Sequence, residues 1–149
     1  MGFLVLLVIK MMPIVVRYMT HEEEGQFEGA AGISEETEEP RYIAIKKGYP
    51  TKESARVFTH ELGHIKFPVD VDEAINTWNW YEYHALNLFR ELCADYFALK
   101  YRIETSKIKW SIGRSKRLAR GLGLTRSMIE RLDRVARQRV GYTGKEVKW

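Results

Sequence analysis

The chain has 149 residues, enough for one domain or for one domain with a small appendage, and a domain of this size needs no disulfide to be stable. Its apolar content of 45% and charged content of 30% are those of an ordinary soluble globular protein, and its net charge is +4. A single cysteine, Cys93, excludes an internal disulfide and fits a reducing, cytoplasmic compartment; its apolar neighbours favour a core position over a nucleophile.

The N-terminal segment is rich in Val, Ile and Leu, and we expect residues 3–9 and 14–18 to form one or two buried strands. Its apolar run is too short for a membrane span, which needs about 20 residues. It also lacks the basic start and the small-residue cleavage site of a secretory signal. A membrane anchor is the less favoured alternative, and initiation at Met11 or Met12 is another.

A glutamate-rich segment, residues 22–40, separates these strands from a third one. It contains eight Glu and several Gly, a composition that predicts an exposed loop or an irregular hairpin. Residues 41–47 (RYIAIKK) alternate between apolar and polar and predict the third strand, which residues 48–50 end. The sequence therefore predicts a small sheet in the first part of the chain.

Two helices follow this sheet. Thr51 at the N-cap and Glu53 in the first turn predict a helix over about residues 52–66, which Pro68 closes. Apolar residues then repeat at helical spacing, without Gly or Pro, and predict a long helix from about residue 80 to 102.

The first of these helices carries the motif His60-Glu61-Leu62-Gly63-His64. Residues four apart lie on one face of a helix, so both imidazoles can bind one tetrahedral ion. Glu61 then leans over the open coordination position, where it can take a proton from a metal-bound water. Zinc suits two nitrogens and one carboxylate. The alternative is two exposed histidines on a surface helix.

A catalytic zinc held by two histidines needs a third protein ligand. Glu91, on the long helix 27 residues after His64, is the candidate. Asp95 lies four residues further along the same face, and we expect it to hydrogen-bond the far nitrogen of a ligand histidine, in the first place His60. The alternative is that Glu91 pairs with a neighbouring basic residue on a solvated face.

The two motifs together, H-E-L-G-H and E-L-C-A-D-Y-F-A, resemble the ImmA/IrrE group of small gluzincin-type zinc metallopeptidases, over roughly residues 41–100. The plan is also similar to that of archaeal minimal gluzincins. The resemblance implies a zincin-like fold with zinc on His60, His64 and Glu91. It makes Glu61 the base that activates a zinc-bound water to hydrolyse a peptide bond. It further implies that the peptide lies extended along an upper edge strand.

Related enzymes add a His, Tyr or Arg that stabilises the oxyanion. His84 is a candidate because it lies seven residues before Glu91 and shares its helix face. Tyr81, Tyr83 and Tyr142 are others, and a lone helical histidine is more often structural. The resemblance also implies a peptide or protein substrate, for which a repressor or another regulatory protein is one candidate.

We expect residues 1–103 to form a zincin-like metallopeptidase domain and residues 104–149 a basic helical tail. Residues 102–149 carry 14 Lys/Arg and 4 Asp/Glu, a balance of +10, against −6 for residues 1–101, which carry 10 and 16. Such a tail can bind a polyanion or fold back on the acidic part of its own chain.

Within the tail, residues 118–129 resemble a helix-turn-helix with Gly123 in the turn and Thr125 or Ser127 as the cap of the second helix. The residues expected to face DNA are Arg126, Arg131 and Arg134. A pair of helices covering the peptidase core makes the same pattern. A third option is that residues 142–149 fold into the cleft and restrain activity.

The sequence thus predicts an α+β fold in which a small twisted sheet packs on an HExxH helix and a long glutamate helix, with a basic helical tail. The favoured function is zinc-dependent peptide hydrolysis in the cytoplasm, without a membrane partner. One alternative is a DNA-binding regulator with a structural or sensing zinc site. Another is a metal-binding remnant without catalytic activity.

Overall fold

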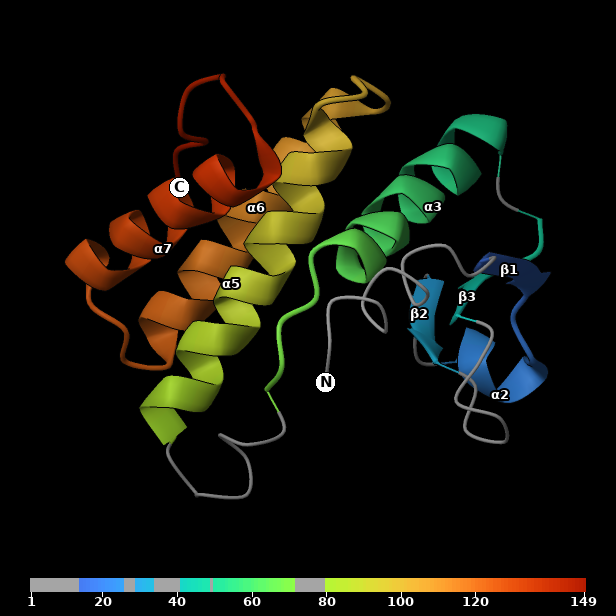
Figure 1. Cartoon of the computed structure of the whole chain (residues 1–149), viewed down its shortest axis with the longest axis horizontal. Helices are drawn as coiled ribbons and strands as arrows, with labels where there is room; N and C mark the ends of the chain where they lie inside the picture. The colour runs from blue at the N-terminus through green and yellow to red at the C-terminus, as the bar shows by residue number, and fades with distance from the viewer. Residues whose placement is uncertain (1–13, 26–28, 34–40, 49, 72–79) are drawn as a thin grey trace, which may run out of the picture.

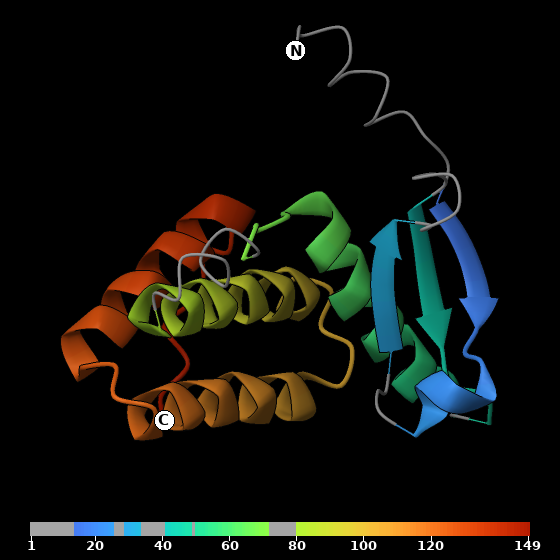
Figure 2. The same ribbon diagram turned by 90° about the horizontal axis from the view of Figure 1, so that it is seen from below.

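The computed structural model describes residues 14–25, 29–33, 41–48, 50–71 and 80–149. Over these residues the chain is an α+β protein with a three-stranded mixed sheet and five helices. The sheet lies at one end of the molecule, one helix crosses it, and the three C-terminal helices lie on the far side of that helix (Figures 1 and 2). The strand predicted at residues 3–9 is outside the described residues.

The sheet has the order β1-β3-β2 and consists of β1 (Ile14–Tyr18), β2 (Gly29–Ile33) and β3 (Arg41–Ile45). The central strand β3 runs parallel to β1 and antiparallel to β2; Ile43 lies opposite both Val16 and Ala31. Strands β1 and β3 confirm the strands predicted at residues 14–18 and 41–47, but the predicted burial of the first is wrong, because Val15 and Val16 of β1 are 42% and 55% exposed.

The described residues of the glutamate-rich segment form regular structure. The segment begins with the short helix α2 (His21–Glu24), which Thr20 and Glu23 cap reciprocally, and continues into β2. The hairpin alternative is therefore correct for residues 29–33, because β2 pairs antiparallel with β3. Gly and Ala have low intrinsic strand propensity, so β2 depends on its pairing with the buried β3.

Helix α3 (Thr51–Lys66) packs against β2 and β3, in agreement with the helix predicted at residues 52–66. Its predicted cap is wrong. Pro50 occupies the N-cap position in an extended conformation (ψ 153°), no side chain caps the helix, and Thr51 is already helical. The helix ends where the N–H of Phe67 bonds to the carbonyl of Gly63, one residue before Pro68.

Helix α5 (Trp80–Leu99) is the central helix of the molecule, and all residues from 92 to 99 are buried. They include Cys93, which confirms its predicted core position. A helix buried on every side needs apolar residues all round, which accounts for the run Leu-Cys-Ala-Asp-Tyr-Phe-Ala-Leu. It is three residues shorter than predicted, since the chain turns back with positive φ at Arg102 and Glu104.

The C-terminal helices α6 (Thr105–Gly121) and α7 (Arg126–Val140) both pack on α5 and share one apolar core with it. Figure 2 shows α6 running alongside α5 with its N-terminal end toward the sheet. Of the two predicted caps for the second helix, Thr125 is the one used: its side chain accepts from the N–H of Met128 (3.2 Å). No described helix is both long and apolar enough to cross a membrane.

The C-terminal residues 142–149 pack on this bundle and not in the cleft, because a buried polar network holds them there. Asp133 accepts from the Tyr96 hydroxyl and lies 2.6 Å from Nζ of Lys116. Lys116 also donates to the carbonyl of Val147 (2.8 Å), whose N–H donates to the Tyr96 hydroxyl (3.0 Å). Each buried charge thus has a partner, as low dielectric surroundings require.

Candidate metal centre

The candidate metal centre lies where α3 and α5 cross at backbone contact. A Cβ built on Gly63 would lie 2.9 Å from Cα of Ala94 and 3.1 Å from its carbonyl oxygen, closer than real Cβ atoms approach backbone. Gly63, inside the motif itself, is therefore the residue that permits this close crossing.

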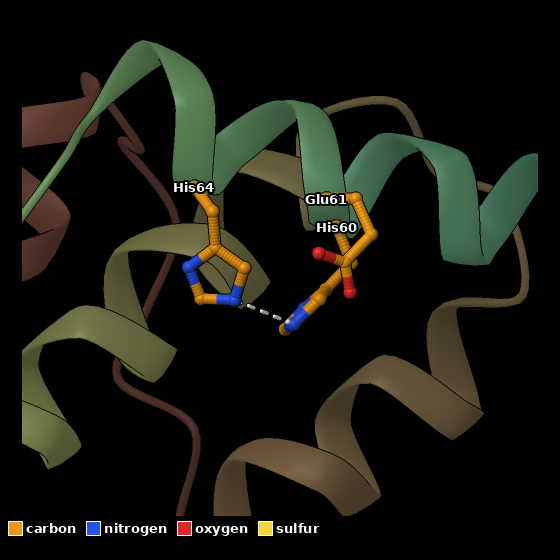
Figure 3. Close-up of side chains that lie close together, drawn as sticks. All are labelled: His60, Glu61 and His64. Carbon is orange, nitrogen blue, oxygen red and sulfur yellow. Dashed lines mark hydrogen bonds between the residues drawn. The ribbon is translucent and has the colours of Figure 1, made fainter. Parts of the chain in front are cut away.

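The two histidines of the motif lie on one face of α3 and point toward each other (Figure 3). Their Nε2 atoms are 3.0 Å apart, and the rings are nearly perpendicular, at 89°. Both nitrogens therefore face one small volume, as the spacing of four residues predicts.

The orientation of His60 is fixed by the long helix. Its Nδ1 hydrogen-bonds Oδ1 of Asp95 at 2.7 Å, which is the contact predicted from the sequence. A carboxylate can only accept, so Nδ1 carries the hydrogen and Nε2 is the nitrogen turned toward His64. The second oxygen, Oδ2, accepts from the hydroxyl of Ser111 on α6 at 3.0 Å, and Asp95 is only 3% exposed.

Two carboxylates approach the pair of imidazoles. The carboxylate oxygens of Glu91 contact both rings: its Oε2 lies 3.4 Å from Nε2 of His60, and its Oε1 lies 3.4 Å from Nε2 of His64. Glu61 is 8% exposed, and one of its oxygens forms with the two imidazole nitrogens a group whose atoms all lie within 4.8 Å of one another. Its carboxylate lies beside the His60 ring in Figure 3.

These separations fit a single metal ion. Donor atoms about 2.0 Å from a tetrahedral ion are about 3.3 Å from one another. The separations between the two Nε2 atoms and the Glu91 oxygens, 3.0, 3.4 and 3.4 Å, are close to that edge length. The described residues therefore include a group of histidines and glutamates able to hold a metal ion.

The electrostatics of the cluster also favour a cation. Burial alone would lower the pKa of His60, but the carboxylates of Asp95 and Glu91 outweigh it and raise that pKa well above 6.5. Burial and the charge of His60 lower the pKa of His64 to about 3. Burial opposes ionisation of Glu91, yet the hydrogen bond and charge of His60 lower its pKa to about 2. Burial raises the pKa of Glu61. The carboxylates of Asp95 and Glu91 thus stabilise a positive charge on His60, and the same carboxylates would stabilise the positive charge of a metal ion at this place.

A cavity of about 660 Å³ opens over this cluster. The edge strand β2 forms one wall with Gly29, Ala30 and Ala31, and the opposite side is formed by α5 and α6. A Cβ on Gly29 would overlap the side chain of Val57 and lie 3.2 Å from Cγ of Glu61, so only glycine lets β2 approach this closely. The sequence left an irregular hairpin open for this segment but did not indicate that the segment forms a wall of the cavity.

The residues predicted to stabilise an oxyanion do not line this cavity. The ring of His84 packs instead on Trp80 and Tyr83, with centroids 4.6 and 5.2 Å away. Seven residues place it on the face of Glu91 but about 10 Å along the helix axis, two turns away. The ring of Tyr142 packs at a tilt against that of Tyr96 in the C-terminal bundle, and Tyr81 is exposed. The cavity is lined instead by Tyr42, Arg90 and Arg114.

The tail arginines lie elsewhere. Arg126, Arg131 and Arg134 are exposed on α7 and do not line the cavity, and the guanidinium of Arg126 lies 5.1 Å from the ring centroid of Trp149. Their predicted outward orientation is therefore present, and contact with DNA stays a prediction.

Ser111 and Arg114 are further residues that sequence reasoning did not find. Both come from α6, in the part of the chain expected to be a tail, and no motif marks them. Only the packing of α6 on α5 brings them to the metal centre.

No protein-family model, curated protein or solved structure matches the chain. The fold and the site define an α+β protein with a partly buried cluster of two histidines and two glutamates that lines an open cavity.

Proposed function

We propose that the protein is a zinc-dependent metallopeptidase with a zincin-like arrangement of its two metal helices. The observation that carries this proposal is the convergence of His60, His64 and Glu91, from two helices, at separations of 3.0 to 3.4 Å. Two imidazoles and one carboxylate are the ligand set that suits catalytic zinc, and three protein ligands leave one position for water or substrate.

Glu61 is the group left free to move a proton. Zinc held by His60, His64 and Glu91 would supply a Lewis acid that polarises a peptide carbonyl and favours deprotonation of the attacking water near neutral pH. Glu61 lies beside the same cluster on α3 and, with three other ligands present, is not needed to hold the ion. Its buried carboxylate accepts a proton from the attacking water and returns it to the leaving amine.

Strand β2 supports a peptide as the substrate. Within the described residues β2 pairs with β3 alone, so its other edge has backbone N–H and C=O groups without strand partners. That edge borders the cavity, and its Gly-Ala-Ala sequence leaves room for a second chain. An extended peptide can add to such an edge through main-chain hydrogen bonds, which would lay a scissile bond over the metal cluster.

The experiment that tests this function is the substitution Glu61→Gln in the zinc-loaded protein. Since the amide keeps the shape of the side chain but cannot accept the proton, we expect peptide cleavage to be lost while one zinc per chain is retained. Cleavage of a peptide pool at wild-type rate by this variant would overturn the role of Glu61. Absence of cleavage by the zinc-loaded wild-type protein over a broad peptide pool would overturn the peptidase.

A further inference from the structure

We propose that the cavity recognises a carboxylate of the peptide substrate, and that Arg114 is the side chain that binds it. The proposal rests on the proposed function for its substrate class and extends it to specificity. It follows from the charges that line the cavity, from the place of Arg114 in its wall, and from the geometry of the guanidinium group.

The cavity contains guanidinium groups that lack acidic partners. Three arginines line it. Arg56 forms an ion pair with Glu53 at 3.1 Å. In the part of the chain that the structure describes, neither Arg90 nor Arg114 has a carboxylate oxygen within 4.0 Å. Two positive charges therefore face the cavity without a paired anion.

The acidic residues of the cavity, in contrast, are mostly paired. Glu23 forms a bidentate ion pair with Arg17, at 2.7 and 3.1 Å. Asp95 and Glu91 contact the imidazoles. With a dication bound, the ion, Arg90 and Arg114 would carry four positive charges. The carboxylates of Glu61, Glu91 and Asp95 carry three negative charges, which leaves an excess of one positive charge. A cavity with this balance attracts a ligand group with one negative charge.

Arg114 is placed to meet such a group. It lies on α6, three residues after Ser111, on the side of the cavity opposite β2. Its side chain is exposed, so a ligand can reach it. Its guanidinium lies 5.6 Å from the ring centroid of Trp110, one turn earlier, and this stacking limits the orientations of the fork.

A carboxylate fits this site better than other anions do. The planar guanidinium offers parallel N–H donors that match the two oxygens of a carboxylate. One excess positive charge balances a monoanion. A peptide on the β2 edge has two sources of such a group: an Asp or Glu side chain that points across the cavity toward α6, or its own C-terminal carboxylate.

The test measures binding to zinc-loaded Glu61→Gln protein, in which bound peptide persists. Fluorescence anisotropy compares two peptide pools that are identical except that every Glu in one is Gln in the other. Each pool is prepared with a C-terminal acid and with a C-terminal amide. Two comparisons result: the Glu pool against the Gln pool, and the C-terminal acid against the C-terminal amide. In one of these pairs we expect the peptides that carry the carboxylate to bind about tenfold more tightly, as a charge-assisted hydrogen bond implies. The pair that shows the difference identifies the source of the carboxylate.

Adding Arg114→Gln should abolish that difference, whereas Arg117→Gln on the same helix should keep it. Arg117 is also exposed and has the same charge, but it does not line the cavity. Equal binding of both members of each pair, a preference that survives Arg114→Gln, or an equal loss in Arg117→Gln would overturn the proposal. Binding is measured in Glu61→Gln, which lacks the base, and therefore does not depend on cleavage. If the wild-type protein cleaves no peptide, that result contradicts the proposed function but not the carboxylate site.

Discussion

Gly63 and Ala94 bring helices α3 and α5 into backbone contact, and the geometry of the candidate metal centre depends on that contact. Because no side chain separates the helices here, His60 reaches Asp95 and Glu91 directly, at 2.7 and 3.4 Å. A wider separation of α3 and α5 would lengthen both contacts at once.

Replacing Gly63 with Ala should therefore weaken both the fold and the metal centre. The added methyl meets backbone, which cannot move aside as a flexible side chain can. We expect a loss of about 1–3 kcal/mol in the free energy of unfolding, measured with denaturant, and weaker zinc binding by titration. At Gly121 a Cβ meets nothing within 4 Å, so Gly121→Ala should leave both unchanged or stabilise the helix slightly. Equal behaviour of the two variants would contradict the role of Gly63.

Ser111 should act as a positioning residue for the metal centre. Its hydroxyl holds the second oxygen of Asp95, which in turn orients His60. Removing such an outer hydrogen bond typically weakens metal affinity by about tenfold or more. We expect Ser111→Ala to raise the zinc dissociation constant by that factor, with Ser115→Ala, one turn further along α6, close to wild type. A dissociation constant for Ser111→Ala equal to that of Ser115→Ala would show that the hydroxyl contributes nothing.

Zinc affinity should depend on pH through a single proton. The pKa of His60 is raised well above 6.5, so this imidazole is protonated at neutral pH and must lose a proton before it binds a metal. The pKa of His64, lowered to about 3, adds no second proton. Between pH 6 and the pKa of His60, the apparent dissociation constant should fall by about tenfold per pH unit. Calorimetric titrations in buffers of different ionisation enthalpy count the protons released; a count near zero or two would contradict this charge distribution.

Substitution of basic residues on α7 distinguishes the proposed peptidase function from the alternative function of DNA binding. Since α6 and α7 both pack on α5, we expect them to cover the catalytic core, and we expect the double substitution Arg131→Gln and Arg134→Gln to leave peptide cleavage unchanged. Duplex binding is measured as a function of salt in this variant and in Glu61→Gln. Salt-dependent binding that survives Glu61→Gln and disappears without the arginines would favour the DNA-binding regulator.

Local periodicity explains what the sequence could predict. The spacing of four residues within His60-x-x-x-His64 and within Glu91-x-x-x-Asp95 places each pair on one helix face, whatever the rest of the fold does. Two imidazoles and two carboxylates can satisfy one another only if these two helix faces pack against each other. The hydrogen bond between Asp95 and His60 follows from that reasoning and is present.

Features that depend on tertiary packing were beyond such reasoning. The Gly-Ala-Ala-Gly-Ile segment of β2 has little strand propensity of its own and becomes a strand only beside β3. Ser111 joins the site because α6 folds back along α5. His84 shows the converse, since a shared helix face does not bring a residue two turns away into contact with the site.

The most direct measurement is the zinc content and X-ray absorption spectrum of the wild-type protein and of Glu91→Ala, with Glu130→Ala, an exposed glutamate on α7, as the matched control. We expect one zinc per chain with two imidazole nitrogens and carboxylate oxygen in the wild type and the control, and loss of zinc in Glu91→Ala. Full zinc occupancy with an unchanged spectrum in Glu91→Ala would mean that this glutamate is not a ligand, and the convergence of α3 and α5 on one ion would be wrong.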